Sequence, residues 1–242
     1  MTMIRASADA MFQDRLPAGY GAPFYGVYPA VVVDVVDPDG QGQVRVRLPW
    51  SPDADGDAYE TWARLATLMA GANRGTWLIP DVEDEVLVAF EAGNPRRPYV
   101  VGALWNGRDD PPDTMDGAGR NQRKVLCSRN GVKVTLDDSD GSEKLILETP
   151  GGQSVTLQDG PGSVEARDAN GNSVVLDTSG VTVTGSSKVT LAVGGSPVIE
   201  VSAGMVTVNA GMSKFNGVLQ ADTVISKSVV GASYTPGAGN IW

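Results

Sequence analysis

The chain has no histidine and a single cysteine, Cys127, among its 242 residues. Without histidine there is no Ser-His-Asp or Cys-His catalytic arrangement and no histidine-ligated metal site. One cysteine cannot form a disulfide within the chain, and we expect Cys127 to be a small packed residue rather than a reactive thiol. Neither a Gly-x-Ser-x-Gly motif nor a phosphate-binding Gly-x-x-x-x-Gly-Lys motif occurs. We therefore expect no enzyme activity, no cofactor and no metal.

Acidic side chains are plentiful, but their spacing does not predict a metal site. Residues 53–57 resemble the start of a calcium-binding loop, yet Arg64 stands where that loop needs a bidentate glutamate. We expect a solvated turn there. A formal net charge of -10 also argues against nucleic acid as a partner. No apolar run reaches the length of a signal peptide or a membrane span, so we expect synthesis in the cytoplasm without general secretion.

Aromatic residues are scarce after Cys127. Of the fifteen Phe, Tyr and Trp residues in the chain, the second half contains Phe215, Tyr234 and Trp242. Short alternating runs of Val, Leu and Thr nevertheless recur there every 7 to 11 residues, separated by turns rich in glycine, asparagine and aspartate. Period-two alternation predicts strands. A wide single-chain core normally needs large side chains, so a narrow repetitive object fits this composition better.

Two architectures remain open for residues 126–210. We favour an intertwined homotrimeric β-helix, in which each strand pairs with neighbouring chains and no strand edge is left open. Its narrow core would contain one set of inward-facing valines, namely Val134, Val155, Val174, Val189 and Val206. The alternative is a single-chain β-solenoid or sandwich.

The first half of the chain predicts a separate domain. Strand-like runs at residues 26–36, 43–48, 62–68, 75–79, 85–91 and 99–104 are joined by turn signals, which favours a small OB-fold barrel over residues 26–107. We expect its core and rim to be formed by large rings, listed here as Trp50, Trp62, Trp77, Trp105, Phe90 and Tyr99. A polar, Pro- and Gly-rich linker would occupy residues 108–125. Residues 1–25, with a short helix over residues 2–16, would pack on the barrel or contact a partner.

Three segments carry a resemblance to a known family. They are residues 37–50 (DPDGQGQVRVRLPW), residues 62–71 (WARLATLMAG) and residues 78–107, which begin LIPDVEDEVLVAFEAGNPRRP. Together they resemble the OB domain of the central spike family of contractile tails, which includes phage baseplate assembly protein V and the VgrG spikes of type VI secretion. One departure is Glu83, where the family usually has glycine in a turn.

The resemblance implies an all-β homotrimeric spike in the baseplate of a phage virion or a related injection particle, with the β-helix piercing the target cell envelope. Because only about 25 residues precede the barrel, the hub is expected to be a separate polypeptide, and the linker is too short to contain a lysozyme domain. Candidate hub contacts are Phe12, Tyr20, Phe24 and Tyr25.

The apex is expected at residues 211–242, closed by Phe215, Tyr234 and Trp242 or by a separate PAAR-type tip protein. An iron site built from histidines cannot form there. The alternative function is a trimeric receptor-binding or polysaccharide-processing tailspike, which would need a groove rich in aromatic rings and carboxylates.

Overall fold

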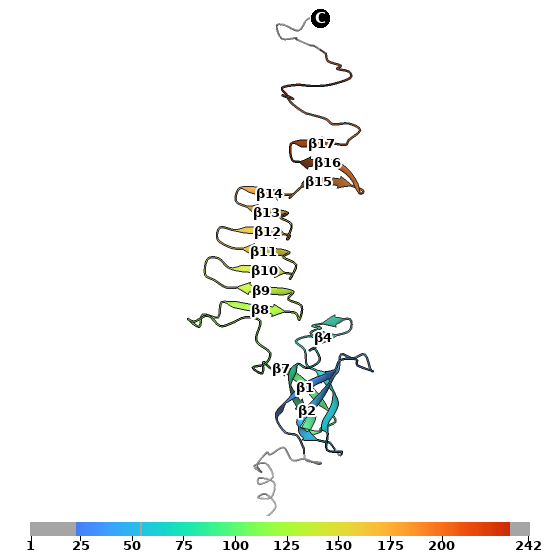
Figure 1. Ribbon diagram of the computed structural model, residues 1–242, viewed down its shortest axis with the longest axis vertical. Helices are drawn as coiled ribbons and strands as arrows, with labels where there is room; N and C mark the ends of the chain where they lie inside the picture. The colour runs from blue at the N-terminus through green and yellow to red at the C-terminus, as the bar shows by residue number, and fades with distance from the viewer. Residues whose placement is uncertain (1–22, 54, 233–242) are drawn as a thin grey trace, which may run out of the picture. The chain divides into compact units, whose positions relative to one another are not determined.

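The computed structural model describes residues 23–53 and 55–232. Every regular element in these residues is a strand apart from one short 3-10 helix, η1 (Glu91–Gly93), which confirms the all-β class (Figure 1). The helix expected at residues 2–16 lies outside the described residues. Within them, no helix has the length and apolar character needed to cross a membrane. The chain divides into two compact units, Met1–Thr114 and Met115–Trp242.

The first unit contains a closed five-stranded barrel with strand order β1-β2-β3-β7-β6. Its strands are β1 (Val27–Asp34), β2 (Val44–Pro52), β3 (Ala58–Leu65), β6 (Glu85–Phe90) and β7 (Pro98–Ala103). All neighbouring strands are antiparallel except β3 and β7, which run parallel. The expected OB-like barrel is therefore present.

Aliphatic side chains fill the barrel, because every second residue of each strand points inward. Along β2, Val44, Val46 and Leu48 are fully buried, whereas the alternating Arg45 and Arg47 are not. Arg45 forms an ion pair with Glu60 on the neighbouring strand β3. The barrel thus has a continuous core of its own.

The rings expected in the core and rim of the barrel differ widely in burial. Phe90 is 7% exposed and lies in the core, but Trp77 and Trp105 are 75% and 69% exposed. A small barrel is just wide enough for Val and Leu to fill its interior, so large rings are displaced to its ends. At one end Phe24, Tyr28, Trp50 and Phe90 form a ring cluster in which Tyr28 stacks on Trp50 at a centroid separation of 4.6 Å.

A short arm replaces the strand expected at residues 75–79. The arm pairs β4 (Ala70–Gly71) with β5 (Arg74–Gly75) and connects β3 to β6. The Thr76 backbone N–H donates to the Met69 carbonyl at 2.9 Å, and the Thr67 hydroxyl donates to the Thr76 carbonyl at the same distance. The arm is therefore closed by its own hydrogen bonds.

Glu83 occupies the turn before β6 with a φ of +78°. This left-handed conformation suits glycine, and holding a non-glycine residue there costs on the order of 1 kcal/mol. Glu83 thus places a side chain at a turn position where the backbone conformation favours glycine.

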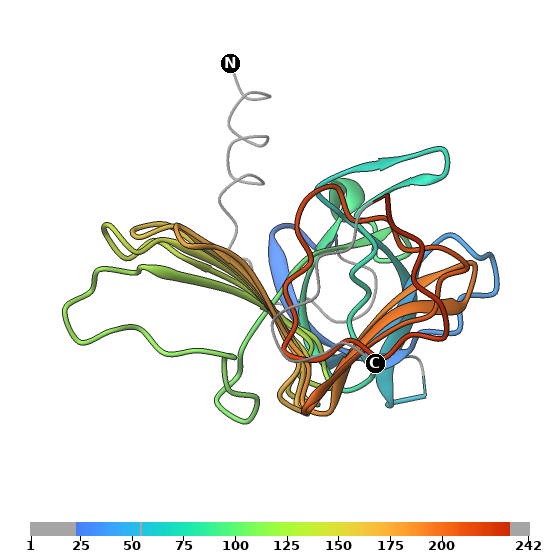
Figure 2. The same cartoon turned by 90° about the horizontal axis from the view of Figure 1, so that it is seen from above.

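The second unit begins with a seven-stranded antiparallel meander. Its strands are β8 (Arg123–Cys127), β9 (Lys133–Asp137), β10 (Lys144–Glu148), β11 (Ser154–Gln158), β12 (Ser163–Arg167), β13 (Ser173–Asp177) and β14 (Gly180–Thr184). A three-stranded sheet follows, with β15 (Lys188–Val193), β16 (Ser196–Ser202) and β17 (Met205–Val208). Residues 209–232 form no helix or strand. Seen from above, the strands of the meander lie nearly over one another (Figure 2).

The hairpins on one side of the meander share a five-residue turn. In the Asp168–Asn172 turn, the Asp168 backbone N–H donates to the Asn172 carbonyl at 3.1 Å, and Gly171 has a φ of +85°. The turns at residues 128–132 and 149–153 repeat this bond, with glycine again at the fourth position. Such a turn needs a left-handed residue there, which explains the spacing of the Asn-Gly and Gly-Gly pairs.

Candidate functional site

The strand register of the meander places one complete apolar face on the sheet. Residues paired across antiparallel strands share a face, so the pairs can be followed from β8 to β14. One row starts with Leu126 and Val134, and a second row starts with Leu136 and Leu145. The face, called the apolar face below, consists of Leu126, Val134, Leu136, Leu145, Leu147, Val155, Leu157, Val164, Ala166, Val174, Leu176, Val181 and Val183.

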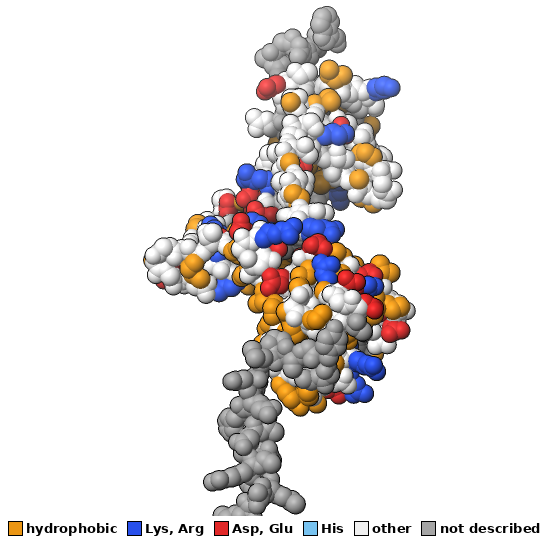
Figure 3. Space-filling view, turned by 60° about the horizontal axis from the view of Figure 1, so that its bottom comes forward, with side chains coloured by type: hydrophobic (Ala, Val, Ile, Leu, Met, Phe, Trp, Pro, Cys, Tyr) orange, Lys and Arg blue, Asp and Glu red, His pale blue; other side chains and the backbone are white. Residues whose placement is uncertain are grey.

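This apolar face is open in the single chain. All of its members except Val134 and Leu145 are exposed, with Val181 at 68% and Leu126 at 54%. Hydrophobic side chains are visible over the surface of the described residues in Figure 3. Soluble monomers rarely expose contiguous apolar patches larger than a few hundred Å², and larger patches mark interaction sites. The face is therefore a candidate assembly surface.

The opposite face is mainly polar and carries charge pairs, although Val125, Ile146 and Val175 also lie on it. Lys133 on β9 lies opposite Glu148 on β10, with 3.9 Å between Nζ and Oε2. Glu165 forms an ion pair with Arg167 on the same face of β12. Such exposed pairs contribute little to stability, but they keep this face compatible with water. The two faces thus differ in the way expected when one is covered and the other is solvated.

The structure brings the expected trimer-core residues onto apolar faces. Val134, Val155 and Val174 lie in one row of the meander, alternating with Leu147 and Ala166. In the three-stranded sheet, Val189 and Val206 both pair with Val201 and share its face. That these valines surround a trimer axis stays a prediction.

The residues chosen from the sequence left out Leu126, Leu147, Ala166 and Val183 of the first row and Leu136, Leu157 and Leu176 of the second. The available signal was the residue two positions away within each strand, because side chains two apart share a face. Leu136 and Leu157, for example, follow the chosen Val134 and Val155 by two residues.

Strand pairing differs from the expectation that each strand pairs with neighbouring chains. Strands β9 to β13 have both edges paired with consecutive strands of the same chain. The five-residue turns bring consecutive strands together locally, which leaves no backbone groups on these strands for another copy. Copies of this meander would therefore meet through side chains of the apolar face.

A groove of about 700 Å³ runs along the apolar face. It is lined by Val134, Leu147, Val155, Ala166 and Val174 of the meander and continues to Val189 of β15. The two sheets of the second unit therefore contribute to one continuous apolar surface. A neighbouring apolar side chain would find both room and matching chemistry there.

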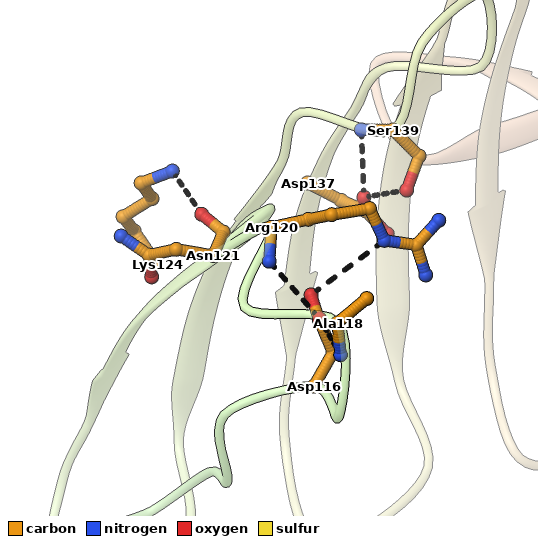
Figure 4. A network of polar contacts seen from close by, with 7 residues as sticks. All are labelled: Asp116, Ala118, Arg120, Asn121, Lys124, Asp137 and Ser139. Carbon is orange, nitrogen blue, oxygen red and sulfur yellow. Dashed lines mark hydrogen bonds and ion pairs between the residues drawn. The ribbon is translucent and has the colours of Figure 1, made fainter.

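A polar network borders the apolar face at β8 (Figure 4). Lys124 is the charged member of the row that contains Leu136, and its ammonium group donates to the Asn121 carbonyl at 2.6 Å and to Asp138 at 2.8 Å. Before it, the Asp116 carboxylate accepts a backbone N–H bond from Arg120 and another from Ala118, and these bonds lower the pKa of Asp116. An ordered turn and the first three residues of β8 thus lie within residues 108–125, the range expected to be a linker.

Asp168 stabilises one of the five-residue turns. Its carboxylate accepts a 2.7 Å bond from the Asn172 side-chain amide and a 2.9 Å bond from the Asn172 backbone N–H. With further bonds from Asn170, these lower the pKa of Asp168 from 3.8 to about 2. Asp53 likewise accepts backbone N–H bonds from Asp55 and Asp57 at 2.9 and 3.0 Å, as a turn residue does. Both carboxylates therefore serve their turns as hydrogen-bond acceptors.

The residues expected to contact a hub or close the tip are only partly described. Phe12, Tyr20, Tyr234 and Trp242 lie outside the described residues. Phe24 is 8% exposed and packs in the barrel, with its backbone N–H bonded to the Gly93 carbonyl at 2.8 Å. Tyr25 is exposed, and Phe215 is 67% exposed in a segment without strands. These roles therefore stay predictions.

Among the described residues, no group of three or more Cys, Asp or Glu side chains has a geometry that could hold a metal ion. Cys127 is exposed rather than packed, because it lies on the polar face of the edge strand β8. The apolar face is the candidate functional surface of the second unit.

Comparison with known proteins matches both units to families. Residues 28–105 match the type VI secretion system/phage-baseplate injector OB domain. Residues 144–219 match the phage baseplate V C-terminal trimerisation domain. The second match includes β10 to β17 and most of the apolar face.

Individual relatives are spike proteins of type VI secretion. The chain is 29% identical over 114 residues to the spike protein VgrG1a of Pseudomonas aeruginosa, which covers 44% of this chain and 18% of VgrG1a. It is 32% identical over 112 residues to VgrG4b of the same organism, covering 44% of this chain and 14% of that protein. VgrG3 of Vibrio cholerae is 26% identical over 137 residues, 48% of this chain and 12% of VgrG3. The chain thus spans less than a fifth of the length of these relatives.

Proposed function

The chain belongs to the VgrG-like family of baseplate and spike proteins, and we propose that it is the structural central spike of a contractile injection machine. The observation that carries this proposal is the open apolar face on a unit that matches a trimerisation domain. Soluble monomers rarely expose a contiguous apolar face of this kind, so we expect it to be covered by association.

Three copies would cover the apolar faces by forming a three-sided needle. Each copy would direct its aliphatic face to the common axis and its charged face, including the Lys133 and Glu148 pair, to the solvent. Strand pairing within each chain supports this arrangement, because the meander leaves side chains rather than backbone groups to make contact. The limited twist of the strands in Figure 2 also supports it, since flat multi-stranded sheets are usually stabilised by stacking.

The role is mechanical in this proposal, and no reaction step is assigned to the chain. The barrel would join the needle to a hub component, and a PAAR-type protein or the chain's own last residues would close the tip. Assembly would place the protein in the baseplate of a phage or of a related injection particle. The relatives named for type VI secretion and the baseplate domain matches support both settings.

Light scattering on the full chain tests the proposal. We expect a particle of three times the 25.2 kDa chain mass at micromolar concentration. Binding of an apolar-surface dye should be weak, because the apolar faces are covered. A folded monomer with strong dye binding would contradict the proposal.

A further inference from the structure

One end of the barrel carries exposed apolar side chains that the barrel itself does not cover. Strands β1 and β7 end there and β6 begins there, since Val31 pairs with Glu85 and the Leu104 backbone N–H donates to the Glu85 carbonyl at 2.9 Å. Leu68 is 95% exposed, Val36 79% and Leu78 61%, and Trp105 follows β7. This end differs from the opposite one, where the ring cluster around Phe24 is packed.

The arm between β3 and β6 presents much of this apolar surface. Trp77, at the base of the arm, packs closely against Gly42 on one side, because a Cβ atom added at Gly42 would lie 3.0 Å from the indole ring. The other side of the ring faces outward. Arg74 is the charged residue of the arm, and it forms no ion pair within the described part of the chain. The arm is thus an apolar hairpin with one cation at its turn.

The rim around β6 has the opposite charge and its own apolar residue. Glu83 and Glu85 flank Asp84 beside the exposed Val82. Position 83 is a glutamate although its backbone φ of +78° favours glycine. A strained residue of this kind persists where its side chain contributes elsewhere, and no ion pair of Glu83 forms within the described residues.

We propose that in the trimer the arm of each barrel docks on the β6 rim of a neighbouring copy. Trp77 and Leu68 would cover Val82 and Trp105 of that copy, and Arg74 would meet Glu83. The contact joins two different surfaces, so three copies related by a three-fold axis close it into a ring. The inference rests on the proposed trimer.

Opposite charges on the arm and the β6 rim, together with the short connection between the two units, favour a second copy of this chain as the partner that binds this surface. The arm contributes a cation and apolar side chains, and the rim contributes acids and apolar side chains, so the two surfaces of one chain are complementary. Nineteen residues, 104 to 122, separate β7 from β8. Once the second units have associated, this short connection holds the three barrels at an effective concentration on the order of millimolar, so a weak contact suffices.

Cross-linking of the full chain tests the contact. In a Cys127→Ser background, a chain with Arg74→Cys and one tag is coexpressed with a chain that carries Glu83→Cys and a second tag. We expect mild oxidation to give a disulfide-linked pair containing both tags, because each chain has one cysteine and cannot link internally. The matched control replaces Glu83→Cys with Asp55→Cys, an exposed turn position at the other end of the barrel, and should give at least fivefold less of the mixed pair.

Charge reversal supplies an independent measurement. Arg74→Glu and Glu83→Arg should each accelerate hydrogen exchange at the Thr76 amide severalfold, and the double variant should restore the original rate because every contact again has opposite charges. An intact trimer that yields no mixed pair above the control overturns the docking and leaves the proposed spike standing. A double variant that exchanges as fast as the single variants also overturns it. A monomer by light scattering would overturn both proposals.

Discussion

The barrel and the meander solve the problem of hydrophobic burial in different ways. The barrel closes on itself and buries eleven hydrophobic residues, from Phe24 to Val100. In the described residues of the second unit no hydrophobic side chain is buried, and the buried residue there is Thr135. The barrel therefore has a core of its own, whereas the meander leaves its apolar face uncovered, as expected if other copies supply the missing half of its core.

Removing the second unit should have the largest effect on assembly. A chain ending after Gly107 loses the whole apolar face but keeps every buried core residue of the barrel. We expect a folded monomer by sedimentation, with cooperative unfolding monitored by tryptophan fluorescence. The full chain should instead show a trimer whose unfolding temperature rises with protein concentration. A trimeric fragment would show that the barrel, and not the meander, drives association.

A charge on the apolar face should have the next largest effect. Val183 and Thr182 are neighbours on β14, and both are exposed in the single chain. Val183→Asp would place three carboxylates in the core of the needle, at a cost of several kcal/mol per ion. Thr182→Asp would place them on the solvated face. We expect light scattering to show loss of the trimer for Val183→Asp and an intact trimer for Thr182→Asp.

Equal behaviour of these two variants would contradict the covered face. A monomer treats both positions alike, because both side chains already contact water. The pair therefore distinguishes an association surface from a solvent-exposed sheet without a change of strand.

Local patterns predicted the strands better than they predicted which chain each strand pairs with. The alternation around Val134 and Val155 and the Asn-Gly and Gly-Gly spacings gave the strands and turns of the meander. Pairing within one chain was not predicted, because the aliphatic pattern is the same for a hairpin and for an intertwined β-helix. The turn geometry at Asp168 decides between them by returning the chain to its own preceding strand.

Aromatic content was a poor guide to the barrel core. Trp77 is as large as Trp50, yet Trp50 packs on Tyr28 and donates an indole N–H bond to the Pro29 carbonyl at 2.9 Å, whereas Trp77 is exposed. Burial depends on the position along the barrel axis, and no local pattern in the sequence records that position. The candidate assembly face, by contrast, follows from strand alternation once the register is known.

A cavity in the barrel core should reduce stability without changing assembly. Leu48 is fully buried, and Leu48→Ala should lower the free energy of unfolding of the barrel by about 2–5 kcal/mol. The trimer should persist, because Leu48 lies in the core of the barrel and is not part of the apolar face of the second unit. Thermal unfolding followed by tryptophan fluorescence measures the loss, and light scattering checks the trimer. A change that depends on protein concentration would mean that the two units are not independent.

The smallest effect is expected from a turn on the meander. Hydrogen bonds from Asn172 and then Asn170 lower the pKa of Asp168 to about 2, so the ionised carboxylate stabilises the folded turn. For a lowered pKa, this contribution is complete above the ordinary value of 3.8 and is lost as the pH falls toward 2. Asp168→Ala should therefore lower the unfolding temperature at pH 7 and have little effect at pH 2.

Asp168→Asn keeps an acceptor oxygen for the same N–H groups, so it should retain most of the stability at pH 7 and remove the dependence of that stability on pH between pH 4 and 2. Thermal unfolding of the three proteins at both pH values measures this, and an Asp168→Ala shift of the same size at pH 2 and pH 7 would show that the charge does not stabilise the turn.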